Sequence, residues 1–287
     1  MTLPITRAIV PVAGLGTRMM PMSAVLPKAL LPLTDGRNRC LAVIHWIAAA
    51  ARDAGVEELA LVISPTQQEP LAKYFAAACN GSTFDKADPP LPRVYYVVQD
   101  RPAGFGDAVL RAEPLMGNEP FLLLLGDHVY TSPAGAPSCV AQVVQAFGKH
   151  PAAAMIGMQS VEESELPNVG AARGEPLAKD AMPPRLFRCT DFIEKPTADQ
   201  AQRLITPGLP DGRYLAHAGI YVFTPEIFDC LSAVRPDANN ELQLADAQSL
   251  LLERHPKEYL LCEIAGRAYD TGNPAGYAAA VKQWVQR

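Results

Sequence analysis

The chain reads AIVPVAGLGTR over residues 8–18, a short apolar run followed by a loop that contains Gly14 and Gly16. A continuous apolar run bounded by turn residues is typical of a buried strand. Glycines let the backbone of the loop approach a ligand closely, and successive N–H groups in such a turn can bind an anion. We therefore expect a buried strand at residues 8–12 that leads into an anion-binding loop at residues 13–18.

Strand and helix patterns alternate through the first half of the chain. The sequence predicts strands at 59–64, 94–99 and 121–125, and helices at 41–54, 70–78 and 107–112. The second half is less regular, with strands expected at 152–158, 187–193, 217–223 and 259–264 and helices at 225–232, 242–253 and 274–286. Between the first two of these strands, residues 162–184 are rich in proline, glycine and charge, and we expect a loop that acts as a lid or lies beside the substrate.

This alternation predicts an α/β fold with a Rossmann-like mixed, mostly parallel sheet flanked by helices. The sequence contains no internal repeat and no low-complexity linker. We therefore expect residues 1–287 to form a single domain.

Composition excludes several classes of protein. The formal net charge is −5 with no basic stripe, which argues against a nucleic-acid binder. The six cysteines form no CxxC pair, so a zinc site is not expected, and reduced thiols suit the cytosol. The apolar stretches are the length of strands rather than of membrane spans. We expect a cytoplasmic protein without a membrane partner.

A second loop, PKALLP at residues 27–32, places one lysine between two prolines. Prolines stiffen the chain, and a stiff loop holds the Lys28 ammonium where it can stabilise charge on a phosphoryl group. Arg18 adds a planar fork of donors that suits phosphate. Each feature also has a simpler interpretation, a tight turn for the glycines and a surface position for the lysine. Met19 breaks the dinucleotide pattern GxGxxG, and the loop lacks the GK[ST] ending of a P-loop.

Taken together, these two loops resemble the signature of bacterial UTP–glucose-1-phosphate uridylyltransferases, members of the sugar-1-phosphate nucleotidyltransferase family. The resemblance continues in the same order over nearly the whole chain, through Gln99, residues 104–107, Asp127, Gly170, residues 194–196, residues 241–246 and residues 269–273. It implies a nucleotidyltransferase fold of the GT-A-like type. The nucleotide-binding half would be about 1–130 and the sugar-phosphate-binding half about 131–287.

The resemblance further implies transfer of a uridylyl group from UTP to a sugar 1-phosphate, expected to be glucose 1-phosphate, with a UDP-sugar and pyrophosphate as products and Mg²⁺ as cofactor. Arg18, Lys28 and Lys195 would be the catalytic cations, with Lys195 on the sugar phosphate. Ala13, Gly14, Gly16, Gln99, Gly104 and Asp127 would contact the nucleotide. Gly170, Glu194 and Gly219 would line the sugar pocket, and Asp127 and Asp270 would bind the metal. We also expect a homo-oligomer, a dimer or tetramer.

Elementary chemistry supports the metal site independently. Asp127 ends a leucine-rich strand, and ligands of open α/β sheets bind at the carboxyl ends of strands. Two carboxylates together with phosphate oxygens and waters suit Mg²⁺. Asp127 or Asp270 alone could equally be a cap or turn residue, and Glu194 with Lys195 an exposed pair. His128 has no second histidine at ligand spacing and is interpreted as loop structure.

Two departures from the family pattern keep other functions open. Ala29 stands where these uridylyltransferases usually carry glutamate, and Gly126 precedes Asp127 where they usually carry proline. Gly-Asp is common in thymidylyl- and adenylyltransferases of this fold, so a nucleotidyltransferase for another base or sugar is the first alternative. A non-catalytic regulatory paralogue that binds sugar nucleotides is the second, and it is disfavoured because Lys28, Asp127, Lys195 and Asp270 are all present. A glycosyltransferase would need a DxD motif, which residues 127–129 do not supply.

Overall fold

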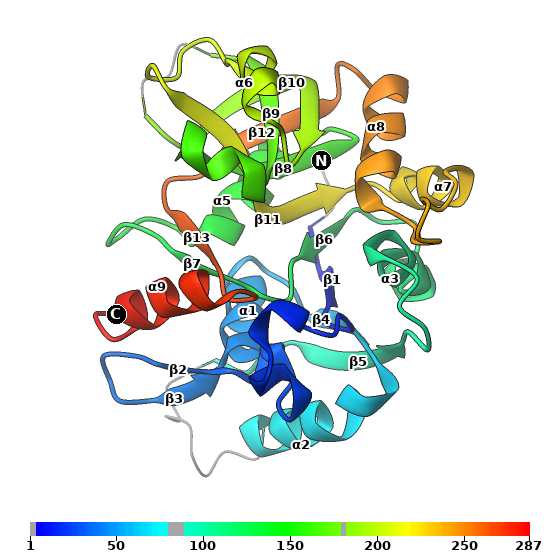
Figure 1. Ribbon diagram of the computed structural model, residues 1–287, viewed down its shortest axis with the longest axis vertical. Coiled ribbons are helices and arrows are strands. Elements are labelled where there is room, and N and C mark those ends of the chain that lie inside the picture. Colours follow the sequence, from blue (N-terminus) through cyan, green and yellow to red (C-terminus); the bar gives the residue numbers. More distant parts are fainter. Residues whose placement is uncertain (1–3, 80–88, 179–181) are drawn as a thin grey trace.

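The computed structural model describes residues 4–79, 89–178 and 182–287 (Figure 1). Its centre is a nine-stranded sheet in the order β5-β4-β1-β6-β11-β8-β12-β10-β9. The strands are β1 Arg7–Pro11, β4 Glu58–Ile63, β5 Arg93–Val98, β6 Phe121–Leu124, β8 Ala154–Glu162, β9 Gly170–Pro176, β10 Arg185–Glu194, β11 Arg213–Phe223 and β12 Tyr259–Glu263. Two small ribbons pair β2 Pro32–Thr34 with β3 Cys40–Ala42, and β7 His128–Thr131 with β13 Arg267–Asp270.

Helices cover both faces of this sheet. They are α1 Val43–Asp53, α2 Gln68–Cys79, α3 Phe105–Arg111, α4 Glu113–Met116, α5 Cys139–Lys149, α6 Ala198–Ala201, α7 Glu226–Ala233, α8 Leu244–Arg254 and α9 Pro274–Trp284. Short 3-10 helices are η1 Thr17–Met19, η2 Met22–Ala24, η3 Lys28–Leu30, η4 Pro65–Gln67, η5 Glu163–Asn168 and η6 Gln202–Leu204. No described helix is long and apolar enough to cross a membrane.

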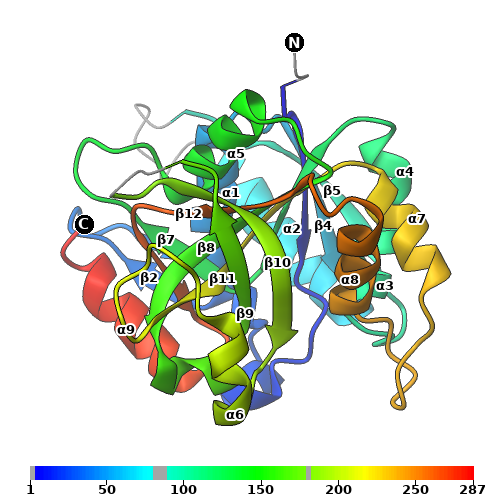
Figure 2. The same ribbon diagram turned by 90° about the horizontal axis from the view of Figure 1, so that it is seen from above.

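Alternation along β1 divides the core into two layers. Ala8 and Val10 pack into a cluster with α1, α2, α5 and α9, whereas Ile9 packs into a second cluster with α3, α7 and α8. Successive side chains of a strand point to opposite faces, so these clusters lie on the two sides of the sheet, as Figures 1 and 2 show. A strand covered on both faces needs a continuous apolar run, which is what residues 8–12 supply.

The sheet is mixed, as predicted, but it is not mostly parallel. Parallel pairing joins β1 to β4 and β6, β4 to β5, and β8 to β12. The five other pairings of the nine-stranded sheet, within the described residues, are antiparallel: β11 with β6, β8 and β9, and β10 with β9 and β12. Two consecutive strands that pair in parallel need a crossover of a dozen or more residues, and the link from β9 to β10 is shorter than that.

The prediction of a loop over residues 162–184 was wrong for much of that segment. It contains η5 and the strand β9, which pairs with β10 and β11. Ala171 and Ala172 of β9 are fully buried, but a strand built from alanine, glycine and arginine lacks the β-branched residues that mark strands in a sequence. Residues 179–181 of the predicted loop lie outside the described residues.

Candidate active site

Asp127 lies directly beyond β6, at the carboxyl ends of the parallel strands β1 and β6. Gly126 lets the chain turn there, because a Cβ at this position would collide with the Pro11 carbonyl oxygen and the Val12 side chain. The glycine that departs from the family pattern is therefore required by close packing against the end of β1. The turn leads into β7, which carries His128.

A second carboxylate reaches the same place from a distant part of the chain. In the ribbon of β7 and β13, Asp270 stands opposite His128, so their side chains share one face. Thr271, which is fully buried, donates from its backbone nitrogen and from its hydroxyl to the carbonyl oxygen of Asp127, both at 2.7 Å. As a result, ligand atoms of Asp127, His128 and Asp270 all lie within 4.8 Å of one another.

Backbone and side-chain donors hold the Asp270 carboxylate. Its Oδ1 accepts from the nitrogen of Gly272 at 2.7 Å, and its Oδ2 accepts from Asn273 Nδ2 at 2.8 Å. Asn273 also caps α9, because its Oδ1 accepts from the nitrogen of Gly276. A Cβ on Gly272 would lie 2.9 Å from Asp270 Oδ1 and closer still to Asp127 Oδ2, so only glycine leaves room for both carboxylates.

Asp127 is ionised in this environment. Burial raises its pKa, but the hydrogen bond from His128 and the charge of Lys28 outweigh that effect and hold the pKa well below its usual range. Lys28 Nζ lies 2.6 Å from Asp127 Oδ2, and only 17% and 12% of the two side chains are exposed. The pair joins the proline-flanked loop at residues 27–32 to the end of β6.

The glycine loop and the proline-flanked loop position two cations at this cluster. Gly16 has a left-handed backbone, and a Cβ there would lie 3.6 Å from the Lys28 side chain, so the two loops pack together. Arg18 Nη1 lies 3.5 Å from Asp270 Oδ2, and 62% of the Arg18 side chain is exposed, so it is open to an incoming anion. A Cβ on Gly14 would meet nothing within 4 Å, so that side of the loop is open. Ala29 is fully buried in the core and cannot face a ligand.

Gln99 and Gly104 are linked by contacts within the protein. Gln99 is buried after β5, and its Nε2 donates to Gly104 O at 3.1 Å and to Asp107 Oδ2 at 2.7 Å. Gly104 has a φ of 100°, and a Cβ there would lie 2.5 Å from the carbonyl oxygen of Leu242. Packing against the backbone of the 241–246 segment is therefore enough to require glycine at position 104, with or without a ligand beside it.

A third group of predicted residues lies on β9, β10 and β11. Gly170 pairs with Glu194, and a Cβ on Gly170 would come 2.6 Å from Glu194 Oε2 and 3.2 Å from His217 Nδ1. Desolvation by this packing raises the pKa of Glu194, and the charge of Lys195 opposes it. Lys195 has a φ of 50°, so the chain turns at the lysine itself, directly before Pro196.

Gly219 connects this group to the carboxylate cluster. It has a φ of 73° and follows His217 within an irregularity of β11. A Cβ at 219 would lie 2.9 Å from Leu125 Cδ1 and 3.1 Å from His128 Cδ2, so the glycine makes space beside the His128 ring.

Two histidines beside the site were not predicted from the sequence: His128 was interpreted as loop structure, and His217 was not identified. His128, interpreted as loop structure, is a strand residue that bonds Asp127 Oδ1 through Nδ1 at 2.9 Å. His217 lies beside Gly170 and packs against Phe192 and Tyr221, and burial lowers its pKa to about 4. His217 stands two positions before Gly219 in the strand expected at 217–223, and regular alternation would put both on one face, which was the available signal for His217.

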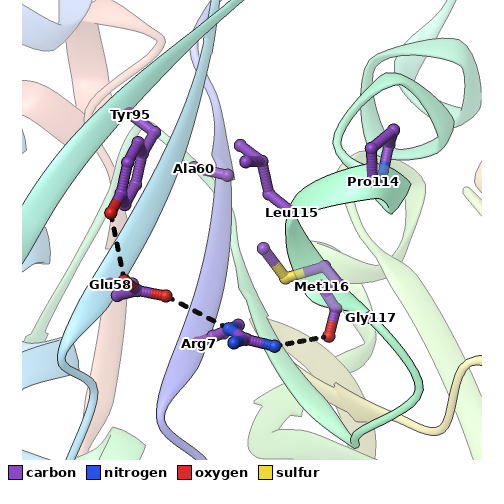
Figure 3. A pocket seen from close by; sticks show the side chains of 8 residues that line it. All are labelled: Arg7, Glu58, Ala60, Tyr95, Pro114, Leu115, Met116 and Gly117. Atoms are coloured by element: carbon purple, nitrogen blue, oxygen red, sulfur yellow. Dashed lines mark hydrogen bonds and ion pairs between the residues drawn. The ribbon is translucent and has the colours of Figure 1, made fainter.

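A separate cavity of about 250 Å³ lies at the amino ends of the parallel strands, away from these residues (Figure 3). There Arg7 Nε donates to Glu58 Oε2 at 3.1 Å and Arg7 Nη1 donates to the Met116 carbonyl oxygen at 3.2 Å. Tyr95 Oη donates to the other carboxylate oxygen of Glu58. This network ties β1, β4, β5 and α4 together, and it contains no residue of the predicted site.

Comparison with known proteins identifies the family of this chain. The family model described as Nucleotidyl transferase matches residues 7–287. The UTP–glucose-1-phosphate uridylyltransferases of Staphylococcus epidermidis and Staphylococcus haemolyticus are each 31% identical over 98% of this chain and 92% of their own length. A crystal structure of UDP-glucose pyrophosphorylase complexed with UDP-glucose is 28% identical, covers 98% of both chains and has a TM-score of 0.79. The chain belongs to the nucleotidyl transferase family.

Proposed function

We propose that this protein transfers a uridylyl group from UTP to glucose 1-phosphate and so forms UDP-glucose and pyrophosphate. The observation that carries the proposal is the cluster at the end of β6, where Lys28, Asp127 and Asp270 meet beside Arg18. The relatives named for this activity, similar over nearly the whole chain, indicate the substrates.

The donor set at the cluster fits Mg²⁺. Asp127 and Asp270 would hold the ion, since both carboxylates lie within reach of one another and Asp127 is ionised. Mg²⁺ prefers oxygen ligands and usually keeps waters or phosphate oxygens in its remaining positions. When bound, the ion supplies positive charge against the phosphate oxygens of the substrates.

The chain's own cations supply the rest of the charge stabilisation. An oxygen of the sugar phosphate attacks the α-phosphorus of UTP, a new P–O bond forms, and the bond to pyrophosphate breaks. The attacking phosphate is already anionic at neutral pH, so no enzyme nucleophile is needed. Arg18 and Lys28 would hold the triphosphate and the leaving pyrophosphate, and Lys195 would hold the attacking phosphate, which makes catalysis a matter of position and electrostatics.

The two halves of the chain would divide the substrates between them. In the half of about 1–130, Ala13, Gly14, Gly16 and Gly104 would contact the nucleotide. The side-chain amide nitrogen of Gln99 donates its hydrogen bonds to Gly104 and Asp107. Its side-chain carbonyl oxygen would therefore accept a hydrogen bond from the N–H of the uracil imide. In the half of about 131–287, Gly170, Glu194 and Gly219 would line the sugar pocket. That the protein forms a dimer or tetramer, and that it is located in the cytoplasm, both remain predictions.

Lys195→Ala tests the sugar-phosphate half of this proposal. We expect the fold and UTP binding to be retained and kcat/KM for glucose 1-phosphate to fall roughly 10²-fold or more, because the attacking group loses its position. Lys257→Ala, another exposed lysine, is the matched control and should have wild-type kinetics. Unchanged kinetics in Lys195→Ala would show that the sugar phosphate binds elsewhere.

A further inference from the structure

We infer that His128 supplies a nitrogen ligand to the divalent cation held by Asp127 and Asp270. The inference rests on the metal site of the proposed function. It assigns to His128 a role that the two carboxylates alone do not require.

The distances among the three side chains fit one ion. His128 Nδ1 and Asp127 Oδ1 are 2.9 Å apart. Asp270 approaches the same point from the neighbouring strand, and the three ligand atoms lie within 4.8 Å of one another.

Backbone geometry holds the imidazole in place. His128 and Asp270 are opposite residues of the β7–β13 ribbon, so their side chains project from the same face. Only 16% of the His128 side chain is exposed. Gly219 leaves room beside the ring and Gly272 leaves room beside the carboxylates, because a Cβ at either position would crowd them.

The chemistry of the ligands decides the choice of metal. Carboxylates and water suit Mg²⁺, whereas a neutral imidazole adds affinity for first-row transition metals. Without an ion, Nδ1 donates to Asp127 Oδ1; with an ion bound, the ring would carry its proton on Nε2 and would present Nδ1 as the ligand. The rival role for His128 is a hydrogen bond that only orients Asp127, a common arrangement beside metal sites.

Pulsed electron paramagnetic resonance of Mn²⁺ on the full chain separates the two roles. We expect a nitrogen coupling typical of a coordinated imidazole, and we expect its pattern to change when histidine is labelled with ¹⁵N. His128→Asn keeps a donor toward Asp127 but removes the ring nitrogen, so the coupling should disappear. Its Mn²⁺ affinity, measured by titration calorimetry, should fall by at least about tenfold with a smaller change for Mg²⁺. His150→Asn, at an exposed histidine, is the control and should keep the coupling.

The outcomes distinguish this inference from the proposed function. If Mn²⁺ binds, if Asp127→Asn abolishes that binding, and if the wild type lacks the nitrogen coupling, then His128 only orients Asp127 and the inference is overturned. The carboxylate metal site would stand in that case. If neither Mn²⁺ nor Mg²⁺ binds, with or without UTP, the metal site of the proposed function fails as well.

Discussion

His217→Gln should change how the stability of the protein depends on pH. His217 lies on β11 between the rings of Phe192 and Tyr221, and burial lowers its pKa from 6.5 to about 4. Between these two pH values the unfolded chain binds a proton at this ring and the folded protein does not. The free energy of unfolding therefore falls as the pH is lowered through this window, by about 1.4 kcal/mol per unit.

The magnitude follows from the two pKa values. Relative to pH 7, the histidine should cost the wild type about 2 kcal/mol at pH 5 and about 3 kcal/mol at pH 4. Glutamine does not titrate, so the variant should escape this loss and gain on the wild type by these amounts. The measurement is the free energy of unfolding in urea at pH 7, 5 and 4 for both proteins, with His150→Gln as the exposed control. A constant difference between wild type and His217→Gln across this range would refute the burial argument.

Three other substitutions test particular packing arguments. Gly272→Ala should lower kcat/KM about 10²-fold while the protein stays folded, because its Cβ displaces the two site carboxylates, and wild-type activity would contradict their close approach. Gly14→Ala should leave stability unchanged, since a Cβ there meets nothing, but should raise KM for UTP; an unchanged KM would mean that the nucleotide does not approach this backbone. Arg185→Met leaves the buried carboxylate of Glu263 without its partner at 2.6 Å and should cost about 3–5 kcal/mol in urea unfolding, whereas a loss below about 1 kcal/mol would show that the pair contributes little.

The parts of the site that could be predicted are those set by local sequence. Three local patterns indicate the structures in which they occur. An apolar run followed by glycines indicates a strand and a turn, a lysine between prolines indicates a stiff loop, and an aspartate after a leucine run indicates the end of a strand. Asp127 therefore lies at the carboxyl end of a parallel strand, where open α/β sheets bind ligands. Lys28 and Asp127 are far apart in sequence; the family resemblance, not local sequence, puts both at one site, and their side chains are in contact.

The parts that could not be predicted depend on long-range pairing. β7 and β13 are four-residue strands more than a hundred residues apart, too short for alternation to reveal their register. That register is what brings His128 to Asp270, and without it the histidine could be interpreted only as loop. The sequence does not indicate β9, because the buried residues of this strand are alanine and glycine. The requirement for glycine at 104 comes from its close approach to the backbone of Leu242, a long-range contact that the sequence does not reveal.

Pyrophosphate release tests the central claim most directly. The purified protein would be assayed with UTP, dTTP, CTP, ATP and GTP, each against glucose 1-phosphate and galactose 1-phosphate in the presence of Mg²⁺, with Asp127→Asn as the inactive reference. We expect UTP with glucose 1-phosphate to give the highest kcat/KM and Asp127→Asn to lose several orders of magnitude in rate. A higher kcat/KM with another nucleotide, or tight binding of sugar nucleotides without pyrophosphate release, would contradict the proposed uridylyltransferase activity.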